Sequence, residues 1–102
     1  MRNKTLFLLD IKELLKNYLS GLLPLSKLVP KLEELAYAYS QADSLWIQSF
    51  INYWFPLEEV NALLLDDQRN NLSAQEELLI NNCIKDITVL VDNELNKILP
   101  SG

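Results

Sequence analysis

Apolar residues recur along this chain at the three- and four-residue spacing of amphipathic helices, and four segments carry the pattern. The first segment spans residues 5 to 20 and ends before Gly21, a residue that favours a left-handed helix stop. The second begins near Ser26, a predicted N-cap, and ends near Ser40. Pro30 fits this helix only near its first turn, where few backbone donors have partners.

The third segment is rich in aromatic residues and follows Asp43, a predicted N-cap. Its helical spacing holds through Trp54, and Pro56 then interrupts it. Because a residue before proline avoids the helical conformation, we predict a kink or break at Phe55. This segment is interpreted as one helix in two pieces, because the apolar pattern resumes after the proline at Leu57, Val60, Leu63 and Leu64.

The fourth segment follows a polar turn at residues 66 to 72. Ser73 and Glu76 have the spacing of a capping box, which predicts that a helix starts there. The apolar stripe then continues to Ile98, and Pro100 closes the helix. This segment is the longest of the four predicted helices.

Four amphipathic helices with short connections bury their stripes most economically by packing antiparallel around one core. With 49% hydrophobic residues the chain can supply that core, so we predict an all-α, antiparallel four-helix bundle, a single helical domain over residues 1–102. No apolar run approaches the roughly 20 residues of a membrane span. Cys83 is predicted to be a buried, inert thiol, and a single cysteine fits a reducing cytoplasm.

Charge is distributed unevenly between the two halves of the chain. Residues 1 to 55 carry a net charge of +1, whereas residues 56 to 102 hold nine acids against three cations, a net charge of −6. Such a field repels phosphate backbones and attracts basic surfaces, so the expected partner is a cationic protein and not a nucleic acid. The alternative for the charge taken alone is that the acids only maintain solubility.

The residue inventory argues against catalysis. The chain has no histidine, no cluster of cysteines, and only one internal glycine, Gly21, at a predicted helix end. Adjacent acids point about 100° apart on a helix, so paired carboxylates do not converge on one metal or substrate. We therefore predict no catalytic, metal-binding or cofactor-binding residue, and a protein that is not an enzyme.

Partner binding is expected from the paired acids of the second half and from one aromatic residue. Five aromatic residues within ten positions cannot all face inward on one helix, so Tyr53 or Phe55 is expected to be exposed near the acids. An exposed aromatic beside acids is a typical anchor for a basic partner. The predicted partner-binding residues are Tyr53, Glu58, Glu59, Asp66, Asp67, Glu76 and Glu77.

These features together resemble a family, the small immunity proteins that bacteria carry against their own colicin-type or contact-dependent toxins, especially the colicin D immunity group. The residues that carry the resemblance are Leu14, Leu15, Tyr18, Leu19, Ser20, Gly21, Leu25, Ser26 and the aromatic stretch from Trp46 to Phe55. The resemblance implies a cytoplasmic helical bundle that plugs the basic active-site cleft of a cognate nuclease toxin with an acidic surface. The alternative is a helical adaptor or a self-associating bundle, such as a homodimer, that binds through an exposed apolar stripe.

Overall fold

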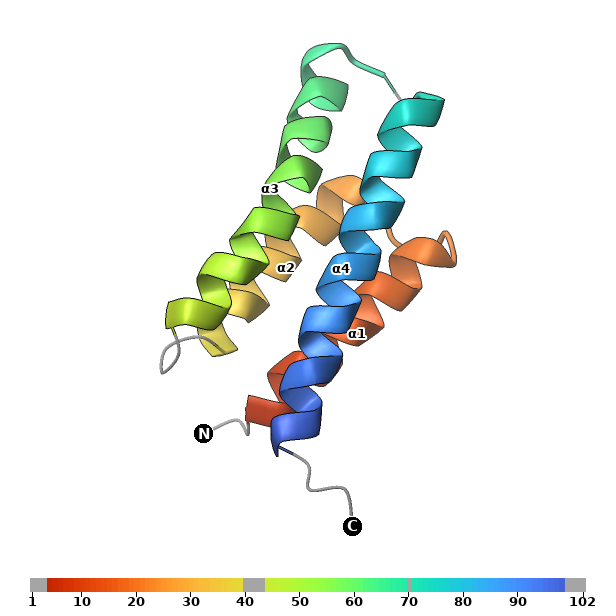
Figure 1. Cartoon of the computed structure of the whole chain (residues 1–102). Coiled ribbons are helices and arrows are strands. Elements are labelled where there is room, and N and C mark those ends of the chain that lie inside the picture. The colour runs from red at the N-terminus through yellow and green to blue at the C-terminus, as the bar shows by residue number, and fades with distance from the viewer. Residues whose placement is uncertain (1–3, 40–43, 70, 99–102) are drawn as a thin grey trace.

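The computed structural model describes residues 4–39, 44–69 and 71–98, which form four α-helices (Figure 1). In chain order the helices are α1 (Lys4–Leu19), α2 (Leu25–Tyr39), α3 (Ser44–Asp66) and α4 (Ala74–Ile98). Consecutive helices run in opposite directions, and α1 and α3 each pack against both α2 and α4. Within the described ranges there is no strand. The prediction of an all-α, antiparallel four-helix bundle is therefore confirmed.

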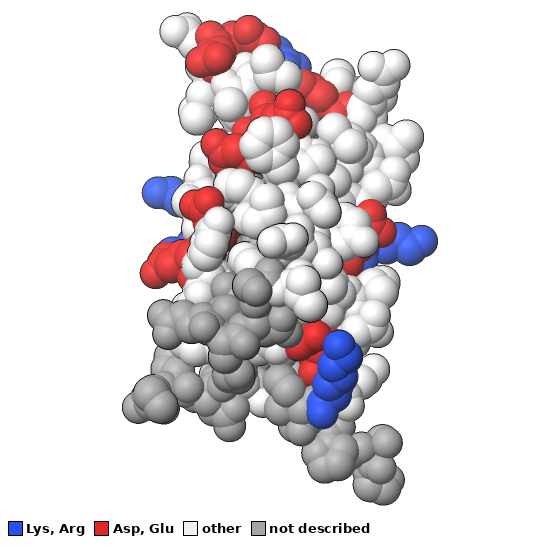
Figure 2. Space-filling model, turned by 60° about the vertical axis from the view of Figure 1, so that its left-hand side comes forward, with Lys and Arg blue, Asp and Glu red and all other residues white. Residues whose placement is uncertain are grey.

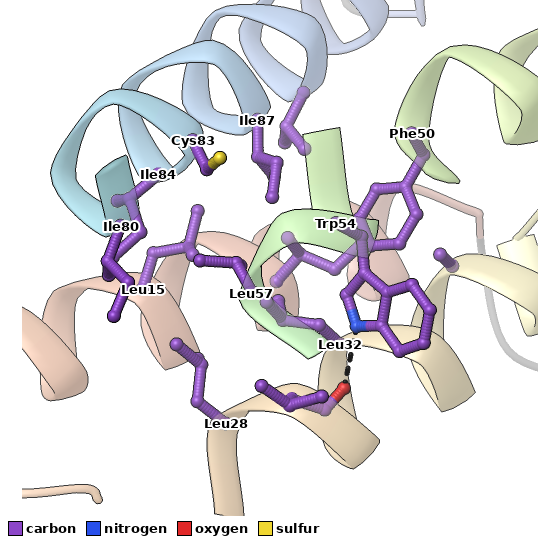
Figure 3. Packing of buried hydrophobic residues seen from close by; sticks show 14 of the residues in the cluster. Leu15, Leu28, Leu32, Phe50, Trp54, Leu57, Ile80, Cys83, Ile84 and Ile87 are labelled. Carbon is purple, nitrogen blue, oxygen red and sulfur yellow. Dashed lines mark hydrogen bonds between the residues drawn. The ribbon is translucent and has the colours of Figure 1, made fainter. Parts of the chain in front are cut away.

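One hydrophobic core lies between the helices, and each helix contributes its apolar stripe (Figure 3). The side chains with no exposed surface are Leu8, Ile11, Leu28, Leu32, Ala36, Phe50, Leu57, Ile87 and Val91. The indole Nε1 of Trp54 donates to the backbone carbonyl oxygen of Val29 at 2.9 Å, which joins α3 to α2. Cys83 is buried beside this core, as predicted. Burial of these side chains, at about 25 cal/mol per Å² of apolar surface, is the main stabilising term.

Helix α1 ends as predicted, in a left-handed turn at Gly21, which has a φ of 79°. The N–H of Leu22 donates to the carbonyl oxygen of Asn17 at 2.9 Å, and the N–H of Gly21 donates to that of Tyr18 at 3.0 Å. This pair of bonds is a Schellman motif, which satisfies carbonyl groups that the helix end would leave without partners.

Helix α2 begins at Leu25, so the predicted N-cap Ser26 is wrong and lies within the first turn. The carbonyl oxygen of Pro24 accepts the N–H groups of Lys27 and Leu28, both at 3.0 Å. Proline lacks a donor but keeps its acceptor, so Pro24 can initiate the helix without an N–H of its own.

Helix α3 continues through Pro56 as a single helix, so its predicted division into two pieces is wrong, and a kink there stays a prediction. An internal proline costs about 3 kcal/mol. Trp54 and Leu57 are buried on either side of it, and their burial offsets that cost. Pro30 similarly lies in the second turn of α2, beyond the first turn expected for it. Three predicted boundary residues fall outside the described residues, namely Ser40, Asp43 and Pro100.

The helices differ in length: α3 and α4 have 23 and 25 residues, whereas α1 and α2 have 16 and 15. At 1.5 Å per residue the longer pair exceeds the shorter by roughly 12 Å. The end of α3 and the start of α4 therefore project beyond α1 and α2, as Figure 1 shows. We call this part the hairpin tip (residues 58–69 and 71–79). Between Val60 on α3 and Ile80 on α4 no described side chain is fully buried, and only Leu64 and Leu72 pack partly buried against the core.

Candidate functional site

Ser73 and Glu76 form a capping box at the N-terminus of α4, within the hairpin tip. The N–H of Ser73 donates to Glu76 Oε1 at 2.9 Å, and the N–H of Glu76 donates to Ser73 Oγ at 3.1 Å. Two backbone donors near the helix start are thus satisfied reciprocally. The helix start predicted from the spacing of these two residues is confirmed.

Arg69 closes the turn between α3 and α4 by pairing with acids of the tip. Its Nη1 and Nη2 each donate to one carboxylate oxygen of Glu76 at 2.9 Å, and its Nε lies 3.4 Å from Asp67 Oδ2. The backbone allows this because Gln68 adopts the left-handed conformation, with a φ of 53°, and the N–H of Arg69 donates to the carbonyl oxygen of Leu64 at 3.0 Å. Arg69, the cation of the hairpin tip, is therefore already paired with two acids of the same tip.

The same contacts control the protonation of Glu76. Hydrogen bonds from the Arg69 guanidinium, and then from the backbone N–H of Ser73, lower the pKa of Glu76 from 4.5 to about 2. The pKa of Arg69 is raised above its ordinary value, chiefly by its hydrogen bonds to Glu76. Both groups therefore stay charged across the physiological pH range.

Negative charge is concentrated in the hairpin tip. Its residues include six acids and one cation, for a net charge of −5. Figure 2 shows red acidic side chains gathered at the upper end of the molecule, where the tip lies. The side-chain carboxylates of four of the acids make no hydrogen bond or ion pair with other described residues: Glu58, Glu59, Asp66 and Glu77. These carboxylates are free to bind the cations of a partner.

The structure brings four of the seven predicted partner-binding residues close to one another. Glu59 and Glu76, from different helices, line one groove between α3 and α4. Asp66 and Asp67 lie at the end of α3, next to the turn that Arg69 closes. Pairing between α3 and α4 thus assembles an acidic surface from residues that are separated along the chain.

The other three predicted residues lie apart from this group. Glu58 is half-buried and points about 100° away from Glu59 on α3. Glu77 lies near α1, where the pKa of Tyr18 is raised first by burial and then by the charge of Glu77. Tyr53, 37% exposed, lies more than one helical turn before Glu58. None of these three residues lines the groove.

The groove between α3 and α4 is a feature that sequence reasoning missed. Its volume is about 300 Å³, and two leucines on its walls, Leu63 and Leu79, are 50% and 42% exposed. Leu63 was expected to continue the apolar pattern of the core, which is wrong: it points about 100° away from Leu64, which packs against the core, and half of its surface is exposed. In the sequence, one signal for the exposure of Leu79 was available: it comes immediately before Ile80, where the regular apolar stripe of α4 begins. The lining residues are Pro56, Glu59, Val60, Leu63, Gln75, Glu76 and Leu79.

A larger groove, of about 370 Å³, lies between α1 and α2. It too has acidic residues, but it includes Lys31, whose Nζ lies 3.6 Å from Glu34 Oε2. The charges of this groove are mixed, so it is a weaker attractor for cations than the hairpin tip. Its lining residues are Asp10, Glu13, Leu14, Lys31, Glu34 and Leu35.

The groups that the hairpin tip presents are carboxylates and leucines, which bind cations and apolar groups. Across the described residues, no three metal-ligating side chains come together. Burial, and then the charge of Asp86, raises the pKa of the Cys83 thiol, which keeps it in the unreactive protonated form. None of the described helices has both the length and the apolar character needed to cross a bilayer.

Comparison with known proteins identifies no relative of this chain. No protein-family model matches the sequence, and neither a curated protein nor a solved structure matches it.

Proposed function

We propose that this protein is an immunity protein, which neutralises a cognate basic toxin of the nuclease class by covering the toxin's active site with the hairpin tip. The observation that carries the proposal is the net charge of −5 within the tip, whose cation Arg69 is already paired. Nucleases hold the phosphate backbone with cationic side chains. Unpaired carboxylates at one end of a rigid bundle are suited to bind those cations in place of the nucleic acid. The resemblance to the colicin D immunity group, which we infer from the sequence features alone, points to the same function.

Electrostatics then makes a specific contribution to binding. Complementary charge mainly accelerates encounter and excludes wrong partners, and it adds less to affinity itself. Exposed charges are screened beyond about 8 Å at physiological ionic strength. The association rate should therefore fall steeply as salt is raised.

The partner can be identified with the tagged full-length protein as bait in extracts of its source cells, at low and at high salt, with mass spectrometry of the bound proteins. We expect one basic protein with nuclease activity, which is released by salt and inhibited by the purified bait. Recovery of the bait alone, unaffected by salt, would favour the self-associating bundle instead.

The place of binding can be tested by charge reversal with a matched control. The test variant is Glu59→Lys with Asp66→Lys in the hairpin tip, and the control is Glu13→Lys with Glu34→Lys in the α1–α2 groove, which changes the net charge equally. We expect the tip variant to slow association with the captured partner at least about tenfold more than the control. Equal slowing by both variants would mean that net charge, and not the tip, attracts the partner.

A further inference from the structure

The hairpin tip combines its charge with apolar side chains that the fold leaves uncovered. Leu63 on α3 and Leu79 on α4 both line the groove and are 50% and 42% exposed, and the neighbouring Leu78 is 63% exposed. Solubility needs only the acids, and three exposed leucines among them work against it. Apolar side chains gathered at one place on a surface are typical of an interaction site.

Charged and apolar groups are interleaved along α3 at helical spacing. Glu59 lies four residues before Leu63 and Asp66 lies three residues after it, so the leucine has a carboxylate one turn away on each side. Both carboxylates are unpaired among the described residues. Glu76, on the opposite wall of the groove, is held in place by Arg69 and by the capping box. The groove is therefore an apolar strip with carboxylates beside it. Glu76 is held in place within the fold, whereas Glu59 and Asp66 are available to bind the cations of a partner.

We infer that this groove is a docking site for a segment of the partner in which a bulky apolar side chain is flanked by lysine or arginine. The inference rests on the proposed function for the basic nature of the partner, and it adds the apolar anchor. At about 300 Å³ the groove lies at the lower limit for small-molecule sites, and it suits one inserted side chain. Cations beside that side chain meet Glu59 and Asp66.

A second copy of this chain is a poorer occupant of the groove. In a symmetric dimer formed through two such grooves, the two hairpin tips would face each other, each with a net charge of −5. Like charges placed across an interface oppose association. Charge complementarity thus selects a basic segment over a copy of the protein itself.

Synthetic peptides test this inference without the natural partner. Three helical peptides of equal length are titrated into the isotopically labelled full-length protein and followed by NMR: one of leucine and lysine, one of alanine and lysine, and one of leucine and glutamine. We expect the leucine–lysine peptide to bind at least about tenfold more tightly than either of the others. Its chemical-shift changes should centre on residues 59–66 and 75–79.

Serine variants supply the second arm of the test. Leu63→Ser and Leu79→Ser should each weaken binding of the leucine–lysine peptide about tenfold, whereas Leu9→Ser, at a leucine 45% exposed on α1, should leave it unchanged. Because all three leucines are partly exposed, the variants should keep the fold, which circular dichroism checks.

Two results would overturn the inference. One is equal binding of the leucine–lysine and alanine–lysine peptides with no effect of Leu63→Ser or Leu79→Ser, which would leave an acidic surface and the proposed function intact. The other is a dimer of the free protein that dissociates in Leu79→Ser, which would make a second copy the occupant. Conversely, if the peptide binds as expected while no basic toxin is captured from cells, the proposed function fails and the docking groove stands.

Discussion

In the body of the bundle each helix packs against two neighbours, whereas at the hairpin tip α3 and α4 extend beyond the helices that would cover them. The same residue types therefore have different environments. Leu57, in the body, has no exposed surface, and Leu63, less than two turns later on the same helix, is 50% exposed. The difference shows that hydrophobicity alone does not place a leucine in the core of this molecule: exposure depends on which face of the helix carries the leucine and on whether a neighbouring helix covers that face.

Acidic residues show the same contrast between the two regions. In the body Glu94 is 8% exposed, accepts a hydrogen bond from the Tyr39 hydroxyl, and lies 3.2 Å from Lys97 Nζ. In the tip Glu59 and Asp66 face water and have no such partner among the described residues. A buried carboxylate must be partnered for the fold to be stable. An exposed carboxylate needs no partner within the fold and is therefore available to bind the cations of another protein.

The largest effect is expected from the core of the body, in Phe50→Ala. Phe50 has no exposed surface and stacks on Trp46 with ring centroids 5.6 Å apart, so its truncation should lower the free energy of unfolding by about 3–5 kcal/mol. Leu63→Ala in the tip should cost less than about 1 kcal/mol, because half of its surface is already in water. Urea unfolding monitored by circular dichroism measures both values. Similar losses in the two variants would contradict the distinction between body and tip.

An intermediate effect is expected from Tyr39→Phe, which removes the hydroxyl that α2 contributes to Glu94 on α4. Among the described residues, the buried carboxylate would keep Lys97 as its one partner, at a cost of about 1–3 kcal/mol in the free energy of unfolding. Tyr53→Phe, at a tyrosine 37% exposed, is the matched control and should change stability by less than about 0.5 kcal/mol. Equal unfolding midpoints in urea for Tyr39→Phe and the unmodified protein would show that this hydrogen bond adds nothing to stability.

The smallest effect is expected at the tip, from Glu76→Gln as pH is lowered. The pKa of Glu76 is lowered in the folded protein from 4.5 to about 2, so its ionised form favours folding. That contribution is complete above the unfolded value of 4.5 and is lost as pH falls through about 2. Urea unfolding at a series of pH values should therefore find the variant less stable than the unmodified protein at neutral pH, with the difference shrinking between pH 4.5 and 2. A difference that stays constant with pH would exclude this role for the ion pair.

Local signals in the sequence predicted the helices and two of their ends. Gly21 and the pair Ser73 and Glu76 were interpreted correctly, because a left-handed stop and a capping box depend on residues close together in the chain. Of the kink or break expected near Pro56, the break is wrong, because α3 is one continuous helix with buried residues on both sides of the proline, and the kink stays a prediction. The pairing of Arg69 with Glu76 was not predicted, because it depends on how the turn folds back.

By itself, the spacing of apolar residues determined that this chain forms four amphipathic helices, and the order of charges determined that its second half is acidic. The tertiary structure alone decided which leucines are covered and which acids share a surface. Helix periodicity is a local property, encoded within a few turns, whereas the exposure of Leu63 and Leu79 depends on which faces of α3 and α4 the other helices cover. The groove at the hairpin tip is lined by residues of α3 and α4 and is decided by how these two helices pair.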